Sequence, residues 1–240
     1  TYLPAAKSLI EQGWSFFASP ASYRVAPLTY LWPALWGADP SSIRIAHMGI
    51  WTACVCLLWH TCKNLAGATA AVISMVLLLL TPQLLLYFPS EMSEPLYLLG
   101  FFGWIHAMSA LFLDNPHKHF YTWQAGIALA IMLLTRPVFQ LMAPAALVGC
   151  LAFIVLRQRI PLSLAPRLSD IYVRPVAWSL FIGLVPLALF IFKNGVIFDF
   201  WALGTGAGTG LYLGLHPLFQ GTEPGFLGFN YDINALILNI

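Results

Sequence analysis

Two glutamates beside an apolar run are the residues best suited to acid–base chemistry in this chain. Glu91 and Glu94 lie three residues apart in the segment PSEMSEP, residues 89–95. If a helix already runs there, this spacing puts both carboxylates on one face. A carboxylate at the boundary between water and lipid can serve as a base, a metal ligand or a sugar contact. A structural role is equally open, because Ser93 can cap a helix, Pro95 suits its first turn, and Glu94 complements the helix dipole.

Two arginines are the candidate anion-binding residues. Arg136 stands in the sequence LTRP between two apolar runs. Its guanidinium could hold a phosphate or pair with Glu94 or Glu91, and the alternative is a structural arginine that snorkels to the membrane surface. Arg24 lies among aromatic residues in YRVAPLTY. A guanidinium there suits an anionic lipid headgroup, and the alternative is an ordinary loop arginine.

Other patterns in the chain point away from metal and nucleotide chemistry. The stretch GTGAGTG, residues 204–210, lacks the Gly-Lys-Ser/Thr of a phosphate-binding loop and does not match G-x-G-x-x-G in register. The histidines are dispersed, so they predict no metal site. The cysteines fall in or beside apolar runs, which predicts packed thiols rather than disulfides or a zinc site. They are Cys54, Cys56, Cys62 and Cys150.

Composition predicts that membrane helices position these residues. Of 240 residues, 8% are charged and 60% hydrophobic, against about 25% and 45–50% in soluble domains. The mean hydropathy is +0.79. So few polar side chains cannot cover the surface of a soluble fold, and a net charge of +2 is too small for nucleic-acid binding. We expect an all-α polytopic membrane protein.

Six apolar runs are candidate membrane spans, since a bilayer core needs about 20 mainly apolar residues per helix. They are residues 43–61, 65–88, 95–113, 121–135, 138–156 and 175–192. Before them, Ala5, Ala6, Leu9 and Ile10 recur at helical spacing, and Gly13 predicts the helix end. A proline- and aromatic-rich stretch, residues 14–36, follows and could lie in the membrane interface.

The distribution of basic residues predicts the orientation. Loops 62–64, 114–120 and 157–174 carry most of the cations, although the opposite segments are much longer in total. The positive-inside rule therefore puts these loops in the cytoplasm. The two long segments, residues 1–42 and 193–240, then share the outer face, where long loops often carry function.

Several short motifs follow one another in an order found in a known family. They are the helix that includes Tyr2, Ala6, Leu9 and Gly13, Arg24 followed by PLTYL, Glu94 followed by PLYL, the element TRP at 135–137, and the segments 185–194 and 206–214. This order resembles the GT-C membrane glycosyltransferases. The likeness is to the group that uses polyprenyl-phosphate carriers, which includes protein O-mannosyltransferase-like enzymes and the lipid A aminoarabinose transferase.

The resemblance implies transfer of a sugar from a polyprenyl-phosphate donor to an acceptor hydroxyl on the outer face, with inversion and a carboxylate base. It implies that Glu94 lines the cavity as a second acid, sugar ligand or metal ligand, and we place Glu91 with it as a catalytic candidate. Arg24 or Arg136 would offset the charge of the departing lipid phosphate. Tyr2 is a further candidate contact to substrate or lipid phosphate.

The resemblance also implies a longer enzyme. The family's catalytic acid and first span would precede Thr1, and further spans would follow Ile240. We therefore expect one transferase domain, truncated at both ends and inactive alone, with an outer loop (1–42), six transmembrane helices (43–192) and a second outer loop (193–240). Some relatives use a divalent metal and others do not, so no cofactor is predicted.

The expected partners are a polyprenyl-phosphate-linked sugar, an acceptor hydroxyl on a protein, lipid or glycan, and the bilayer of a bacterial inner membrane. Two other classes stay open: a transporter or flippase, and a non-catalytic membrane scaffold. Against a transporter, the spans show no inverted repeat and the acids lie at the ends of helices. An acidic residue and one hydrophobic span just before Thr1 would favour the transferase.

Overall fold

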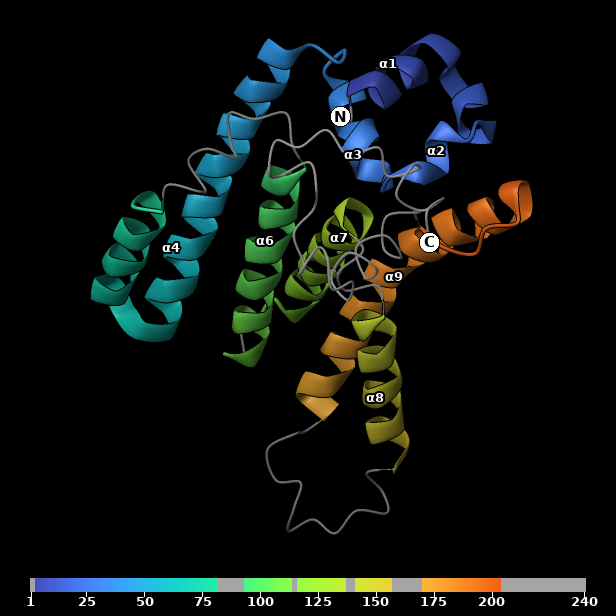
Figure 1. The fold of residues 1–240 in the computed structure, drawn as a ribbon. Coiled ribbons are helices and arrows are strands. Elements are labelled where there is room, and N and C mark those ends of the chain that lie inside the picture. Colours follow the sequence, from blue (N-terminus) through green and yellow to red (C-terminus); the bar gives the residue numbers. More distant parts are fainter. Residues whose placement is uncertain (1–2, 82–92, 114–115, 137–140, 157–169, 204–240) are drawn as a thin grey trace, which may run out of the picture. The chain divides into compact units, whose positions relative to one another are not determined.

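The computed structural model describes residues 3–81, 93–113, 116–136, 141–156 and 170–203, and every regular element within these ranges is a helix (Figure 1). The predicted all-α class is therefore confirmed for the described part. The chain divides into two compact units, Thr1–Leu203 and Gly204–Ile240. The second unit, with the glycine-rich stretch and most of the predicted second outer loop, lies outside the described residues.

The segment before the first long helix is itself helical. It contains α1 (Leu3–Gln12), the 3-10 helix η1 (Gly13–Ala18), α2 (Ala21–Arg24) and α3 (Pro27–Leu35). The first helix ends before Gly13, as predicted, and Gly13 has a φ of 58°. The aromatic residues after Gly13 fold onto α1, so the helical structure continues through most of the segment before α4.

A small hydrophobic core holds the helical segment before α4 together. Phe16 and Tyr30 are fully buried and their ring centroids lie 5.1 Å apart in an edge-to-face arrangement, a favourable aromatic geometry. The Tyr30 hydroxyl donates to the backbone oxygen of Ser22 over 3.3 Å, and burial raises the pKa of the Tyr30 phenol. Trp14 is instead 89% exposed.

Helix α4 (Pro40–Leu79) contains two predicted spans and a sharp break between them. Asp39 caps its start by accepting from the Ser42 N–H at 2.8 Å. Gly67 has a φ of 90° and a ψ of 175°, so residues 40–66 and 68–79 form separate helical legs, and the chain reverses there (Figure 1). The turn predicted at residues 62–64 is wrong, because the chain turns where glycine adopts a positive φ without steric cost.

Three further helices pack closely through small residues. Helix α6 (Glu94–Phe112) packs on α7 (Lys118–Thr135), which packs on α9 (Asp170–Phe198). A Cβ on Gly100 of α6 would lie 2.7 Å from the Ala128 backbone oxygen of α7. A Cβ on Gly126 of α7 would lie 2.6 Å from Ile182 of α9. Such close approach of small residues is typical of helix packing in membranes.

Contacts at both ends show how these helices alternate in direction. Glu94 at the start of α6 pairs with Arg136 just after α7. At the other end, the Tyr172 ring near the start of α9 lies 6.1 Å from the Phe112 ring and 5.9 Å from the Lys118 ammonium. The bundle therefore has a "Glu94 end", where α6 begins and α7 and α9 finish, and an "Arg174 end", where α7 and α9 begin.

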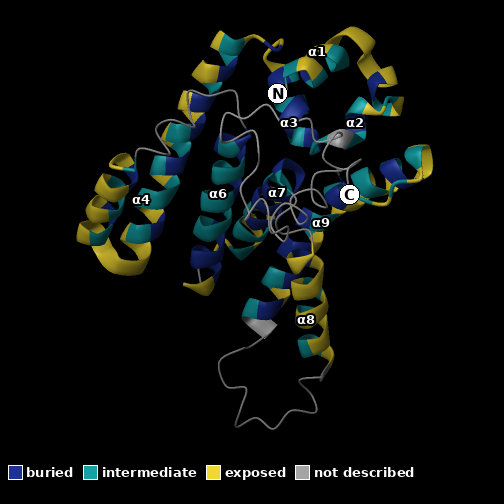
Figure 2. Ribbon diagram, viewed as in Figure 1, coloured by how far each residue is buried: buried dark blue, intermediate teal, exposed yellow. Residues whose placement is uncertain are grey.

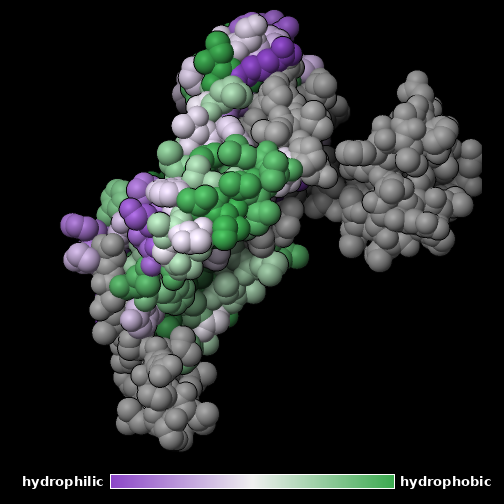
Figure 3. Space-filling model, turned by 90° about the vertical axis from the view of Figure 1, so that its left-hand side faces the viewer, coloured by the Kyte–Doolittle hydropathy of each residue, from purple (hydrophilic) through white to green (hydrophobic). Residues whose placement is uncertain are grey.

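Three helices among the described residues are long and apolar enough to cross a bilayer: α4, α6, and residues Tyr172–Phe198 of α9. Helix α8 (Met142–Leu156) is apolar but shorter and packs on α9. Much of the surface of α8 and of residues 68–79 of α4 is exposed (Figure 2), and the large exposed side chains there are apolar. Hydrophobic residues also form a broad patch on the face drawn in Figure 3. Helices that are apolar on their exposed faces suit a lipid surrounding.

Candidate functional site

The Glu94 end carries the residues that were predicted to do chemistry. Helix α6 starts at Glu94, with Pro95 in its first turn as expected. Ser93 occupies the capping position, but its backbone is helical (φ −82°, ψ −12°) and its side chain makes no cap. The predicted capping role of the Ser93 hydroxyl is therefore wrong, because a capping serine normally needs an extended backbone to reach the free N–H groups. The hydroxyl is buried and has no partner among the described residues.

Arg136 is the partner of Glu94. Helix α7 ends at Thr135, and Arg136 follows with an extended backbone (φ −141°, ψ 134°) that turns its side chain out of the helix line. The guanidinium Nη2 donates to Oε1 of Glu94 in a direct ion pair. The two residues are 42 positions apart in the sequence. Of the partners that the sequence left open for Arg136, the structure shows Glu94.

Neighbouring groups on α6 orient the guanidinium. The Arg136 Cζ lies 5.9 Å from the centroid of the Tyr97 ring, within the range of a cation–π contact. Tyr97 is three residues after Glu94, so both side chains project from one face of α6. One turn further on, Gly100 lets α7 approach. The position of Arg136 thus depends on how closely α6 and α7 pack.

The pair leaves hydrogen-bonding capacity on both partners. Arginine has five N–H donors, and Glu94 is the one hydrogen-bond acceptor that the described residues offer the Arg136 side chain. The Glu94 Oε2 likewise has no protein donor within the described part. The Arg136 side chain is 41% exposed and that of Glu94 is 20% exposed. An incoming anionic oxygen can therefore bind the guanidinium while a ligand hydroxyl donates to the carboxylate.

Lys193 is a cation toward the end of α9 (Asp170–Phe198) that the sequence motifs did not single out. Its ammonium donates to the Ser22 Oγ at 3.0 Å. It also lies 5.3 Å from the Phe198 ring centroid and 5.9 Å from those of Phe17 and Phe190. These contacts join α9 to the helical segment formed by α1, η1, α2 and α3. The sequence feature that could have indicated this contact is the group of phenylalanines on both sides of Lys193.

The remaining predicted site residues cannot be placed beside this pair. Glu91 and Tyr2 lie outside the described residues. Arg24 ends α2, and its side chain also lies outside the described part. Within the described residues, no three His, Cys, Asp or Glu side chains gather closely enough to hold a metal ion. All four cysteines are free thiols, of which Cys54 is buried and Cys56 is exposed.

Comparison with protein-family models, with curated proteins and with solved structures gives no match. The resemblance to GT-C glycosyltransferases therefore stays a prediction from the sequence motifs.

Proposed function

We propose that this chain belongs to a membrane enzyme that transfers a sugar from a polyprenyl-phosphate donor to an acceptor hydroxyl. The Glu94–Arg136 ion pair carries this proposal. It joins a carboxylate to a partly exposed guanidinium at adjoining ends of two apolar helices. A lipid phosphate and a sugar ring need this combination of an anion ligand and a hydroxyl acceptor at the membrane boundary. In the proposed protein all six predicted spans cross a bacterial inner membrane, and the Glu94 end faces outward.

The reaction is a displacement at the anomeric carbon. The acceptor oxygen forms the new bond to that carbon while the bond to the phosphate oxygen breaks, and the lipid phosphate leaves with the bonding electrons. A carboxylate takes the proton of the acceptor hydroxyl. Arg136 donates to the phosphate oxygens, whose negative charge grows in the transition state. Glu94 orients Arg136 through Oε1 and presents Oε2 to a sugar or acceptor hydroxyl.

The test is turnover by the natural full-length protein in nanodiscs. A panel of polyprenyl-phosphate-linked sugars is supplied, and release of free polyprenyl phosphate is measured. We expect Arg136→Ala and Glu94→Gln each to lower kcat at least tenfold, about 1.4 kcal/mol of barrier. Arg136→Lys should fall between wild type and Arg136→Ala, because lysine keeps the charge but lacks the planar fork.

Two control variants separate loss of turnover through this site from loss caused by removing any arginine or glutamate charge. Arg44 of α4 and Glu11 of α1 are exposed, so Arg44→Ala and Glu11→Gln should stay within about twofold of wild type. Turnover that is unchanged in the Arg136 and Glu94 variants would reject this site. A folded protein that turns over none of the lipid-linked sugars would reject the transferase and favour a transporter or scaffold.

A further inference from the structure

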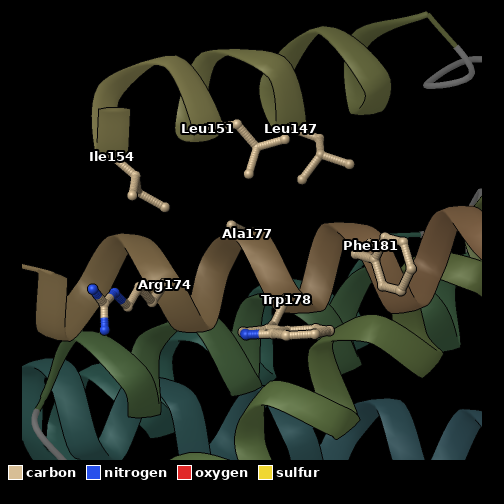
Figure 4. A pocket seen from close by; sticks show the side chains of 7 residues that line it. All are labelled: Leu147, Leu151, Ile154, Arg174, Ala177, Trp178 and Phe181. Carbon is tan, nitrogen blue, oxygen red and sulfur yellow. The ribbon is translucent and has the colours of Figure 1, made fainter. Parts of the chain in front are cut away.

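A ligand rich in hydroxyl groups needs protein donors and acceptors that other residues do not already use. The groove of about 280 Å³ between α8 and α9 offers few of these, because apolar side chains such as Leu147 and Leu151 line most of it (Figure 4). Near the Glu94 end, by contrast, the Ser93 Oγ and Trp32 Nε1 atoms are buried, and neither has a hydrogen-bond partner among the described residues. Such unpartnered buried groups are rare in proteins and indicate a ligand or an ordered water.

The Ser93 hydroxyl lies on the face of α6 that packs against α4 and α3. Ser93 has a helical backbone, so the spacing of α6 extends back to it, and it shares a face with Leu96, three residues later. Leu96 belongs to a hydrophobic cluster with Ile50 and Cys54 of α4. Ser93 is only 4% exposed, so its hydroxyl lies among protein groups rather than in water.

The Trp32 indole packs against the same cluster from α3. The centroid of the Trp36 ring lies 5.5 Å from that of Trp32, and the His47 ring lies parallel to it at 6.4 Å, so the indole is held by rings of α4 and of its own segment. Its N–H can only donate, whereas a serine hydroxyl both donates and accepts. A ligand hydroxyl suits both groups, since it accepts from the indole and exchanges hydrogen bonds with the serine.

Glu94 adds an acceptor to these two groups. It directly follows Ser93, so the two side chains leave the first turn of α6 about 100° apart around the helix axis. Its Oε2 has no protein donor within the described part. A sugar carries several hydroxyls around one ring, so it can supply a partner for the carboxylate as well as for the serine and the indole.

We propose that Ser93 and Trp32 bind hydroxyl groups of the transferred sugar, so that the site prefers a sugar-bearing lipid phosphate to the bare lipid phosphate. Glu94 accepts from a further hydroxyl, and Arg136 holds the phosphate. This inference rests on the proposed function, because the ligand is the donor of that reaction. Ser93 and Trp32 then determine specificity, since a buried group that loses its ligand hydroxyl stays unpaired.

The test is binding to the natural full-length protein in nanodiscs, measured without an acceptor. Undecaprenyl phosphate is compared with undecaprenyl phosphate that carries mannose, glucose or arabinose. We expect wild type to bind at least one sugar-bearing lipid roughly tenfold more tightly than the bare lipid, the value of two neutral hydrogen bonds. Ser93→Ala and Trp32→Phe should each lower this ratio roughly two- to tenfold, and Arg136→Ala should instead weaken both lipids.

Matched variants in α6 test whether the effect belongs to this position. Ser109 is also buried, but its hydroxyl donates to the His106 backbone oxygen at 2.8 Å. Trp104, like Trp32, has a buried indole N–H that no described residue accepts, but it lies about 15 Å along the helix from Glu94. Ser109→Ala and Trp104→Phe should therefore leave the sugar preference unchanged.

The melting temperature without ligand separates a sugar site from a buried water. Removing an unpartnered hydroxyl breaks no hydrogen bond, so Ser93→Ala should melt no lower than wild type. If an ordered water joined Ser93 to Trp32, Ser93→Ala would melt at a lower temperature and keep its full sugar preference. That result would overturn the proposal.

Two other results would overturn it. They are a wild type that binds no sugar-bearing lipid more tightly than undecaprenyl phosphate, and control variants that lower the ratio as much as Ser93→Ala and Trp32→Phe. Failure of the proposed function gives a different result: a sugar preference that needs Ser93 and Trp32, without turnover, would keep the sugar site and reject the transfer. Turnover with an unchanged preference in both variants would reject the sugar site alone.

Discussion

Substituting Gly100 tests the link between helix packing and the Glu94–Arg136 pair. A Cβ at this position would lie 2.7 Å from the Ala128 backbone oxygen and 2.8 Å from the Met132 Cγ, whereas real Cβ atoms essentially never come closer than 3.0 Å to another heavy atom. Because one of these neighbours is backbone, α6 and α7 must separate by several tenths of an ångström. Overpacking of this kind costs about 1–3 kcal/mol, more than the roughly 1 kcal/mol that alanine gains over glycine in a helix.

We therefore expect Gly100→Ala to lower the apparent melting temperature of the detergent-purified protein. The readout is the monodisperse fraction that remains after heating. Gly49 in α4 and Gly149 in α8 are matched controls, since a Cβ on either meets nothing within 4 Å. Alanine there should be neutral or stabilising.

The same separation should reach the ion pair, because Met132 is one turn before Arg136. If turnover is detected, Gly100→Ala should reduce it, and Gly49→Ala should not. A melting temperature for Gly100→Ala that equals or exceeds that of Gly49→Ala would show that α6 and α7 do not pack as closely as described.

Two further predictions concern the helical segment before α4 and the first turn of α4. Lys193→Met should increase protease cleavage around residues 13–24, because it removes the charged hydrogen bond to Ser22 and the ring contacts, together worth about 1–3 kcal/mol. The Ser22 hydroxyl also donates to the backbone oxygens of Ser19 and Phe17, so Ser22→Ala is compared in both backgrounds. It should increase cleavage less in Lys193→Met than in wild type, and equal increases would show that the two residues do not act as a pair. The Ser42 backbone N–H holds the pKa of the Asp39 carboxyl below its ordinary value. Its stabilisation of α4 is therefore present above that ordinary value and lost as pH falls through the lowered native pKa. The protection of amides in the first turn of α4, measured by hydrogen exchange relative to the intrinsic exchange rate at each pH, should fall at acidic pH in wild type but not in Asp39→Ser. Identical pH profiles of protection would refute the role of this cap.

Much of the helical layout follows from local sequence. The predicted span 95–113 matches α6 to within one residue at each end, because an apolar run of bilayer length begins with Pro95. The turn in α4 was misplaced because Lys63 and Asn64 are polar, yet polar residues can continue a helix. Gly67 forms the turn instead, since its φ of 90° is costly for residues with a Cβ. The stretch after Gly13 was predicted only to be able to lie in the membrane interface, because its aromatic composition does not reveal what the rings pack against.

The sequence by itself determined the membrane class, the apolar helices, and the small set of acids and cations that could act at their ends. These properties depend on composition and on neighbours a few residues apart. Only the tertiary structure decided that Arg136 pairs with Glu94 and that Lys193 binds Ser22, which is 171 residues away along the chain. The Glu94–Arg136 pairing depends on how closely α6 and α7 approach, and Gly100 permits that approach because it has no Cβ. The spacing of residues along the chain does not show which helix faces are neighbours, because packing between helices determines this.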